Sequence, residues 1–378
     1  MPESIVLFGG RLLPASETFI LAQGEGLQQF VPYYVGSRLV KGLSLPSQRT
    51  IVVNQGKLLG AAEEALFKVL GFAPRLYQKV QQISPALIHA HFGVCGTLAL
   101  PVAKLLNVPL IVTFHGLDAT MSDQYARRNS LSTRIYLQRR EALKREAHLF
   151  IAVSNFVKNK LLEQGFPPEK ILVHYIGIDT ALFHSTPAIQ RQPVVLFVGR
   201  LVEKKGCEYL IQAMSQVQAV NPDVELVVIG DGVLRPRLEQ LAQQKLQRYQ
   251  FLGTQPPEIV RSWMQQSQVF CVPSITATSG DSEAFGLVFA EAQAMGLPIV
   301  SSVSGGIPEA VAHGETGFLV PERESQGLAV SISRLLQEPS LWQRFSVNGQ
   351  QRVQTHFDLR KQTQALEDIY KGVLSNKF

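Results

Sequence analysis

Three basic residues follow an apolar, β-rich run in the second half of the chain. The segment VLFVGRLVEKKG (195–206) places Gly199 and Arg200 after the run, and then Lys204, Lys205 and Gly206 before a helix-period segment. Cations at a helix N-terminus oppose the helix dipole, so an anion is needed to reconcile them. A diphosphate would fit this turn, and a solvated basic turn is the alternative.

Two carboxylates lie further along, in PSITATSGDSEAFGLVFAEAQAMGLPIV (273–300). On one unbroken helix, Glu283 and Glu291 would be separated by about 12 Å and about 80°. That arrangement fits poorly to a glycosidase, whose two carboxylates lie roughly 5–9.5 Å apart. We therefore expect Glu283 to end a loop and accept sugar hydroxyls, amides near Gly286 to face phosphate, and Glu291 on the helix to hold ribose.

Two further strand-to-turn junctions carry glycines without a decisive pattern. VVIGDGVLRPRLE (227–239) has Gly230 and Gly232, but Arg235 stands where a dinucleotide fingerprint needs its third glycine. This gap argues against a nicotinamide oxidoreductase. The segment SSVSGGIPEAV (301–311) has Gly305 and Gly306 before a proline that can start a helix; close approach of a ligand and turn chemistry remain alternatives there.

The surrounding segments alternate between short β-rich runs and helix-period stretches, which is typical of parallel α/β sheets. Strands are predicted at 5–8, 32–35, 51–53, 87–91, 110–114, 150–153, 171–175, 194–198, 225–229, 250–252, 269–272 and 298–301, with no further strand. Helices are predicted at 58–82, 96–106, 124–147, 155–164, 206–220, 234–247, 257–266, 285–295, 324–337, 340–354 and 359–374. The sequence thus predicts two doubly wound α/β domains joined near residues 184–193.

Length and composition exclude several classes of protein. With 378 residues and 3 cysteines, the chain is too long for a disulfide miniprotein, and its cysteines have no metal-ligand spacing. The N-terminal residues lack the basic start of a signal peptide, and we expect a cytoplasmic protein. The net charge of +6 belongs to the first half, where residues 1–179 hold 19 Lys and Arg against 12 Asp and Glu.

The motifs together resemble a known family. VGRL with KG after it, SEAFGLVFAEAQAMGLPIV, GGIPEAV and GETGFLV occur in the order and spacing of the retaining nucleotide-sugar glycosyltransferases of family four, which have the GT-B fold. The segments LIHAHFG (87–93), TFHGLD (113–118), AVSNFVKNKL (152–161) and GIDTALF (177–183) extend the resemblance into the first half. It implies two Rossmann-like domains facing a central cleft: an acceptor-side domain (1–183), a linker (184–193), a donor-nucleotide domain (194–357) and a C-terminal helix (358–378) returning to the first domain.

The resemblance also implies roles for the donor side. Arg200 and Lys205 would bind the diphosphate, with Glu283 beside the transferred sugar. Backbone amides at Phe285, Gly286 and Leu287 would face sugar and phosphate, and Glu291 would hold the ribose. Further donor-binding candidates are Gly10, Gly199, Gly230, Leu252 and Thr254.

On the acceptor side, the resemblance implies that His115 lies at the cleft near the reacting sugar. We expect His91 to face the cleft and His89 to pack inside. Asp118 either supports His115 or caps the following helix. Glu17 and Thr18 either begin a helix or face the acceptor.

The implied reaction moves a hexose from a UDP- or GDP-sugar to a glycan or lipid-linked acceptor in cell-surface polysaccharide or glycolipid synthesis. A nucleotide-sugar epimerase of the same fold and a transferase to a small soluble acceptor are the alternatives. We expect no metal, because no Asp-x-Asp pair is present and Asp281-Ser-Glu283 is the nearest approach. Arg200, Lys205 and the amides near Gly286 would stabilise the leaving diphosphate.

The basic excess of the first half concentrates in residues 127–145. Its cations are Arg127, Arg128, Arg134, Arg139, Arg140, Lys144 and Arg145, with Glu141 as the single acid in that window. A solvated helix face and attraction to an anionic membrane surface or lipid-diphosphate acceptor are the two interpretations. We expect no nucleic-acid partner, because the segment has one Tyr and no nucleic-acid-binding motif.

Overall fold

The computed structural model describes residues 2–14, 16–56, 58–185 and 190–377. The chain divides into two compact units. Unit 1 comprises Met1–Gly177 with Leu359–Phe378, and unit 2 comprises Ile178–Asp358. The boundary at residue 178 precedes the predicted linker 184–193, of which residues 186–189 lie outside the described residues.

Unit 1 is built on a seven-stranded parallel sheet in the order β3-β2-β1-β4-β5-β6-β7. Its strands are β1 (Glu3–Leu12), β2 (Phe30–Leu39), β3 (Thr50–Asn54), β4 (Leu87–His91), β5 (Leu110–Phe114), β6 (Leu149–Ala152) and β7 (Ile171–Val173). Its helices are α1 (Thr18–Glu25), α2 (Leu58–Leu70), α3 (Pro74–Ile83), α4 (Gly93–Leu106), α5 (Leu117–Thr120), α6 (Asp123–Asn129), α7 (Leu131–Glu146), α8 (Asn155–Glu163) and α16 (Leu359–Leu374). Every residue of β4 and β5 is buried, as expected for central strands of a parallel sheet covered on both faces.

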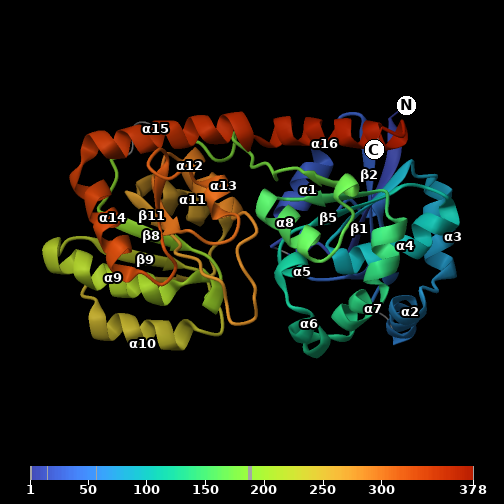
Figure 1. The fold of residues 1–378 in the computed structure, drawn as a ribbon, viewed down its shortest axis with the longest axis horizontal. Helices are drawn as coiled ribbons and strands as arrows, with labels where there is room; N and C mark the ends of the chain where they lie inside the picture. The colour runs from blue at the N-terminus through green and yellow to red at the C-terminus, as the bar shows by residue number, and fades with distance from the viewer. Residues whose placement is uncertain (1, 15, 57, 186–189, 378) are drawn as a thin grey trace. The chain divides into compact units, whose positions relative to one another are not determined.

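Unit 2 has a six-stranded parallel sheet in the order β10-β9-β8-β11-β12-β13. Its strands are β8 (Val194–Val198), β9 (Glu225–Ile229), β10 (Tyr249–Gly253), β11 (Val269–Cys271), β12 (Ile299–Ser302) and β13 (Gly317–Val320). Its helices are α9 (Cys207–Val220), α10 (Arg235–Lys245), α11 (Pro257–Gln266), α12 (Leu287–Ala294), α13 (Ile307–Ala310), α14 (Ser325–Gln337) and α15 (Pro339–His356). Figure 1 shows β8 and β9 between α9 and α10 on one side and α11 and α12 on the other.

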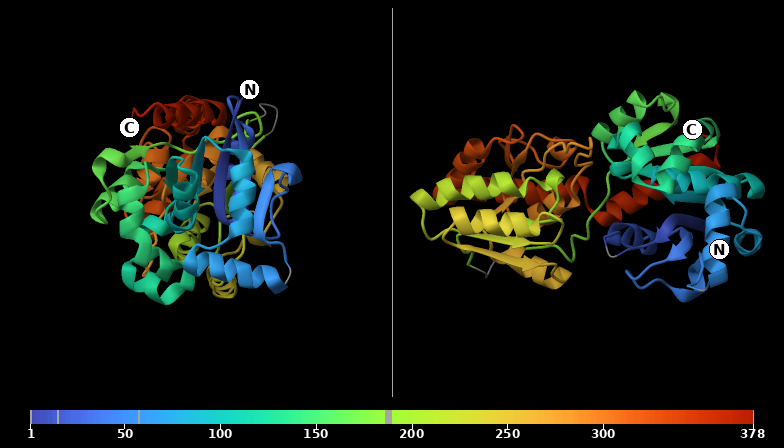
Figure 2. Two further views of the ribbon diagram at one scale, coloured as in Figure 1. Left: turned by 90° about the vertical axis from the view of Figure 1, so that its right-hand side faces the viewer. Right: turned by 90° about the horizontal axis from the view of Figure 1, so that it is seen from below.

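The last helix, α16, belongs to unit 1, although it follows unit 2 in the sequence. Figures 1 and 2 both show it beside the N-terminal strands. The carboxylate of Glu367 accepts hydrogen bonds from the backbone amides of Gln28 and Gln29, and the ring of Tyr370 packs edge-on against Phe30. Leu366 and Val373 complete the apolar core on this side of the sheet. The C-terminal residues therefore form part of the framework of unit 1.

Each predicted strand is present, but three other predictions need correction. The expectation of no strand after 298–301 is wrong, because Gly317–Val320 forms β13 and pairs with β12. A Cβ on Gly317 would lie 2.3 Å from the carbonyl oxygen of Ile299, so glycine permits this close pairing.

The two remaining corrections concern long helices that are interrupted. The predicted helix 58–82 ends at Leu70, because Gly71 adopts a φ of 71° and Pro74 opens the next helix. The predicted helix 124–147 divides at Ser130, whose hydroxyl accepts a hydrogen bond from the amide of Thr133 and caps α7. Among the helices of the described ranges, none combines the length and apolar character needed to span a membrane.

Candidate active site

The basic turn after β8 is fixed to the loop that follows β11. Gly206 adopts a φ of 63°, and a Cβ there would lie 1.9 Å from the carbonyl oxygen of Pro273. The amide of Ile275 donates to the carbonyl oxygen of Lys204 at 2.8 Å. Glu203 accepts two hydrogen bonds from Thr278, through its amide and its hydroxyl. These contacts hold the two loops together, so their charged side chains meet.

Two lysine–carboxylate pairs cross between these loops. Lys205 donates a hydrogen bond to Glu283, and each side chain is 12% exposed. Lys204 donates to Asp281 at 3.0 Å. Burial alone would raise the pKa of Glu283, but Lys205, Lys204 and Arg200 outweigh it and hold that pKa below its ordinary value. Glu283 is therefore ionised beside three cations.

Arg200 differs from the two lysines because its exposed side chain has no hydrogen bond or ion pair with the residues that the structure describes. It lies close enough to Glu283 to lower the pKa of that carboxyl. An exposed guanidinium beside a neutralised lysine pair is suited to bind an incoming anion. The structure brings Arg200, Lys205 and Glu283 together, as the sequence predicts. The direct pairing of Lys205 with Glu283 was not predicted.

Glycines at the carboxyl ends of the strands allow close backbone packing. A Cβ on Gly230, at a φ of 136°, would lie 1.9 Å from the carbonyl oxygen of Gly199. The amide of Gly230 donates to the carbonyl oxygen of Gly253 at 2.8 Å, between Leu252 and the exposed Thr254. One edge of the sheet therefore holds the predicted donor-binding residues Gly199, Gly230, Leu252 and Thr254. Position 230 requires glycine because of its contact with the backbone of Gly199, whether or not a ligand binds.

The segment between Glu283 and Glu291 begins α12. Gly286 adopts a φ of 84° and precedes Leu287, the first residue of the helix, whose leading amides lack intrahelical partners. The ring of Phe285 is buried against Phe357, with ring centroids 4.9 Å apart, so only its backbone is available to a ligand. As predicted, Glu283 lies in the loop and Glu291 on the helix.

Glu291 is a carboxyl with an altered proton affinity. Burial raises its pKa from 4.5 to about 7, and its side chain has no hydrogen bond or ion pair within the described part of the chain. A carboxyl at this pKa carries a proton in about half of the molecules at neutral pH. Its carboxyl group can therefore accept a hydrogen bond from a hydroxyl or donate one to it.

A ladder of three histidines lies at the carboxyl ends of β4 and β5 in unit 1. Nδ1 of His91 is 3.0 Å from Nε2 of His115, and the ring of His89 lies 4.4 Å from that of His91. Burial lowers the pKa of His91 to about 3 and the pKa values of His89 and His115 well below 6.5. All three imidazoles are therefore neutral.

Each histidine has a distinct place in the ladder. His89 packs inside, as predicted, with Nδ1 2.7 Å from the hydroxyl of Tyr370 and Nε2 2.6 Å from that of Thr113. His115 lies between the rings of Phe19 and Phe92, and its buried Nδ1 has no partner among the described residues. Tyr370 was not predicted as part of this network, because it lies 281 residues from His89.

Asp118 acts on the backbone around His115. One carboxylate oxygen accepts from the amide of Gly93 at 2.7 Å and the other from the amide of Gly116 at 3.1 Å. These amides stand at the starts of α4 and α5, so Asp118 caps two helices, and no hydrogen bond to the His115 ring is found among the described atoms. Burial raises the pKa of Asp118 to about 6.

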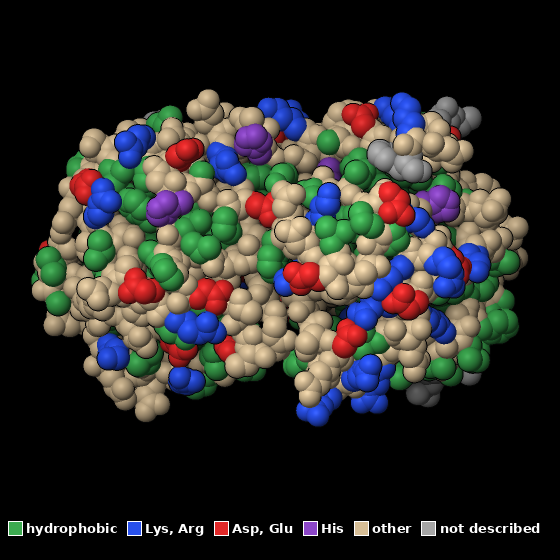
Figure 3. All heavy atoms as spheres, viewed as in Figure 1, with side chains coloured by type: hydrophobic (Ala, Val, Ile, Leu, Met, Phe, Trp, Pro, Cys, Tyr) green, Lys and Arg blue, Asp and Glu red, His purple; other side chains and the backbone are tan. Residues whose placement is uncertain are grey.

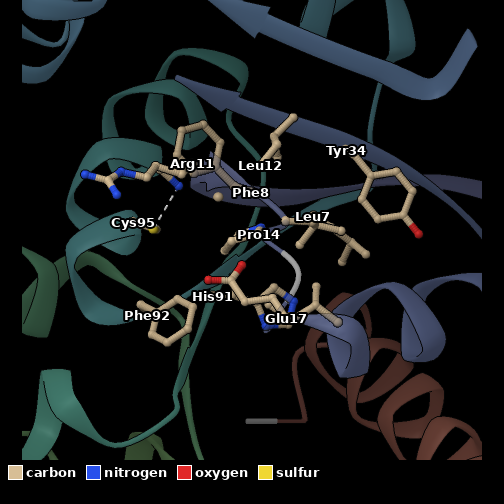
Figure 4. A pocket seen from close by; sticks show the side chains of 14 residues that line it. Leu7, Phe8, Arg11, Leu12, Pro14, Glu17, Tyr34, His91, Phe92 and Cys95 are labelled. Carbon is tan, nitrogen blue, oxygen red and sulfur yellow. Dashed lines mark hydrogen bonds between the residues drawn. The ribbon is translucent and has the colours of Figure 1, made fainter. Parts of the chain in front are cut away.

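A cavity of about 240 Å³ opens beside this ladder, at the ends of β1 and β4 (Figure 4). Its walls are Leu7, Phe8, Gly9, Gly10, Arg11, Leu12, Leu13, Pro14, Glu17, Ile20, Tyr34, His91, Phe92 and Cys95. Glu17 precedes α1 without capping it through its side chain, while Thr18 is exposed at the first position of that helix. Burial raises the pKa of Glu17 to about 7. The predicted residues Gly10, Glu17 and His91 thus share this pocket, whose apolar lining was not foreseen.

The described side chains offer no grouping suited to a metal ion. Within the described ranges, no cluster of three or more His, Cys, Asp or Glu side chains is arranged to hold a metal ion. Asp281 and Glu283, the nearest approach to an acidic pair in the sequence, each bond to a lysine instead.

Two family models match the chain consecutively. Residues 36–182 match Glycosyltransferase Family 4, and residues 179–352 match Glycosyl transferases group 1. The chain belongs to glycosyltransferase family 4. Its fold is GT-B, with the two parallel sheets described above.

Known proteins similar to this family 4 chain include the amylovoran biosynthesis glycosyltransferase AmsK of Erwinia amylovora, 32% identical over 253 residues. The match spans 65% of this chain and 60% of AmsK. The D-inositol 3-phosphate glycosyltransferase of Corynebacterium diphtheriae is 29% identical over 85% of this chain and 79% of its own length.

Among solved structures, sucrose-phosphate synthase from Thermosynechococcus elongatus has a TM-score of 0.78 at 24% identity, over 99% of this chain and 100% of that one. Anabaena HepE, in complex with UDP and glucose, has a TM-score of 0.76 at 23% identity, over 98% and 100% of the two chains. Similarity at this level of identity establishes the common fold.

Proposed function

We propose that this chain transfers a hexose from a UDP- or GDP-sugar to a hydroxyl of a glycan or lipid-linked acceptor, with retention of anomeric configuration. The observation that carries this proposal is the group of three cations, Arg200, Lys204 and Lys205, around the ionised Glu283. Family membership supports glycosyl transfer, and the UDP in HepE supports a nucleotide donor.

The cations stabilise the departing nucleotide. As the bond to C1 breaks, negative charge grows on the diphosphate, and groups already aimed at it lower the barrier. A guanidinium binds phosphate through two parallel hydrogen bonds, whereas an ammonium acts as a point charge, so Arg200 and Lys205 are complementary. Lys205 remains beside Glu283, and the Glu283 carboxylate accepts hydrogen bonds from hydroxyls of the transferred sugar. Amides at Gly286 and Leu287 add their dipoles.

The remaining donor contacts come from the same edge of the sheet. Glu291, half-buried on α12, binds the ribose hydroxyls. The base lies near Gly230, Leu252 and Thr254. Arg200 has no ion pair with described residues, and Lys205 lies close to it in the same turn. We propose that these two cations stabilise the diphosphate without a metal ion, so a chelator leaves the rate unchanged.

The acceptor binds on unit 1. On this unit, His115 offers the acceptor a neutral imidazole, which can exchange a hydrogen bond with a hydroxyl but carries no charge. His91 fixes the ring through its hydrogen bond to Nε2. The name of AmsK supports an acceptor in polysaccharide biosynthesis.

We place this reaction in the cytoplasm, on the inner face of the membrane, where the basic segment 127–145 meets anionic lipid. Figure 3 shows Lys and Arg side chains gathered over the region of α6 and α7. Some of these cations have internal roles: Arg140 pairs with Asp123, Lys144 pairs with Glu141, and Arg139 donates to the carbonyl oxygen of Val69. Arg134 and Arg145 are exposed too, but Arg134 donates to the carbonyl oxygen of Arg127 and Arg145 pairs with Glu146. The exposed side chains of Arg127 and Arg128 have no hydrogen bond or ion pair with described residues, so these two are the most available to lipid.

The proposal is tested by thermal denaturation with UDP, GDP, ADP and their sugars. We expect one nucleotide and its sugar to raise the melting temperature, because a ligand that binds only the folded state stabilises it. The same shift should be lost in Arg200→Ala and retained in Arg237→Ala, an exposed arginine of the same unit that pairs with Glu208. No shift with any of these ligands would contradict the proposal.

A further inference from the structure

The cavity of unit 1 is lined mainly by apolar surface. Eight of the lining residues are Leu, Ile, Phe, Pro or Tyr. The other ionisable residues of the lining are Arg11, Glu17, His91 and Cys95. Behind the wall, the ring of Phe8 packs against Phe67 of α2 with centroids 6.2 Å apart. The apolar lining is therefore continuous with the core of the unit.

Several polar atoms around the cavity are hydrogen-bonded within unit 1; the side chains of Arg11 and Glu17 are the exceptions among the described residues. The hydroxyl of Tyr34 donates to Glu25 at 2.7 Å, so its ring presents carbon to the cavity. The amide of Gly10 donates to Sγ of Cys95 at 3.0 Å, and its carbonyl oxygen accepts from the hydroxyl of Ser37. Nδ1 of His91 is bonded to His115.

Backbone carbonyl oxygens just after β1 also accept hydrogen bonds from within unit 1. The carbonyl oxygen of Leu13 accepts from the amide of Leu43 at 3.1 Å, and that of Pro14 accepts from the amide of Glu17 at 2.9 Å. A sugar ring buried here would leave several hydroxyls without partners, and each unpaired polar group carries a desolvation cost. A hydrocarbon group has no such requirement and gains from leaving water.

Glu17 supplies the polar end of the cavity. Figure 4 shows its carboxylate projecting into the pocket near Phe92, across from the ring of Tyr34. No hydrogen bond or ion pair of this carboxylate is found among the described residues. It is therefore available to a ligand whose apolar part occupies the cavity and whose hydroxyl lies at the edge.

Resting on the transferase function proposed above, we propose that this cavity binds a hydrocarbon group carried by the acceptor, with Glu17 hydrogen-bonded to an acceptor hydroxyl. The acceptor class is then an amphiphile, such as a glycan with an alkyl or polyprenyl aglycone. A purely hydrophilic oligosaccharide would use the polar end and leave the cavity unfilled.

The test compares hexyl β-D-glucoside with methyl β-D-glucoside by isothermal titration calorimetry on the full chain. We expect the hexyl compound to bind at least tenfold more tightly. Cys95→Met, which extends a side chain into the cavity, should reduce this preference to below twofold. Leu105→Met, at an exposed position of the same helix, is the matched control and should keep it.

Folding of each variant is checked by circular dichroism. If Cys95→Met unfolds, Gly10→Ala replaces it, because the new methyl group would lie 3.3 Å from Sγ of Cys95 and narrow the cavity. Equal affinity for the two glucosides in the unaltered protein, absence of binding by both, or an unchanged preference in the cavity-filling variant would overturn the inference.

Nucleotide binding, measured by thermal denaturation on the same samples, separates this inference from the proposed function. A nucleotide-induced shift without a hexyl preference would overturn the hydrocarbon site alone. A hexyl preference without a shift from any nucleotide would overturn the transferase proposal and leave the site.

Discussion

Lys205 donates a hydrogen bond to Glu283, and this pair joins the turn after β8 to the loop before α12. With both side chains 12% exposed, the pair is largely withdrawn from water. Removing one partner of such a pair leaves an uncompensated charge, which is usually more costly than removing both. The pair thus orders the site and holds a cation ready for the donor.

Glu283→Gln should lower the free energy of unfolding by about 3 kcal/mol, because the Lys205 ammonium loses its carboxylate. The double variant Glu283→Gln/Lys205→Met should recover most of that stability. Transfer activity should be lost in both variants. Urea denaturation and a transfer assay on the same preparations check this prediction, and full activity in the double variant would exclude a chemical role for the pair.

Arg200→Ala should lower kcat at saturating donor by about 100-fold, the usual effect of removing one group that stabilises developing negative charge. The melting temperature should change little, because Arg200 has no ion pair with described residues to lose. Steady-state kinetics with Arg237→Ala as the control provides the measurement. An unchanged kcat would show that Arg200 does not stabilise the leaving group.

Glu291 should make the protein less stable as the pH rises. Its folded pKa of about 7 exceeds the ordinary value of 4.5, so the folded state retains a proton that the unfolded state loses. The stabilisation is fully present below pH 4.5 and is lost as the pH rises through 7, by up to about 3 kcal/mol. Glu291→Gln should remove this component in denaturation series from pH 4 to 8. Parallel profiles for the two proteins would contradict the assignment.

The positions of Arg200, Lys205 and Glu283 could be predicted because each lies in the turn of a local strand–turn–helix segment: Arg200 and Lys205 between β8 and α9, and Glu283 between β11 and α12. The pairing of Lys204 with Asp281 could not, since it depends on how two loops from different strands meet. The hydrogen bond between His89 and Tyr370 is still less local, although the predicted return of the C-terminal helix places them in the same domain. The apolar cavity required β1, β2, β4 and α1 together, and no single segment specifies it.

Arg127→Gln/Arg128→Gln should weaken binding to vesicles that contain anionic lipid. Each exposed cation near such a surface contributes about 1 kcal/mol, so the double variant should bind roughly 25-fold less tightly. Co-sedimentation at low and high salt measures this, with Arg237→Gln as the control. If vesicle binding depends on neither lipid charge nor salt concentration, the basic segment is a solvated helix face and has no role in membrane binding.

The central claim, glycosyl transfer from a nucleoside diphosphate sugar with retention, is tested most directly by product analysis. Each α-linked UDP-, GDP- and ADP-hexose is incubated with the full chain and hexyl β-D-glucoside, and the new linkage is assigned by proton NMR. The account predicts a disaccharide product with an α linkage, formed with stoichiometric release of the nucleoside diphosphate. A β linkage, or a changed donor sugar formed without acceptor, would contradict it.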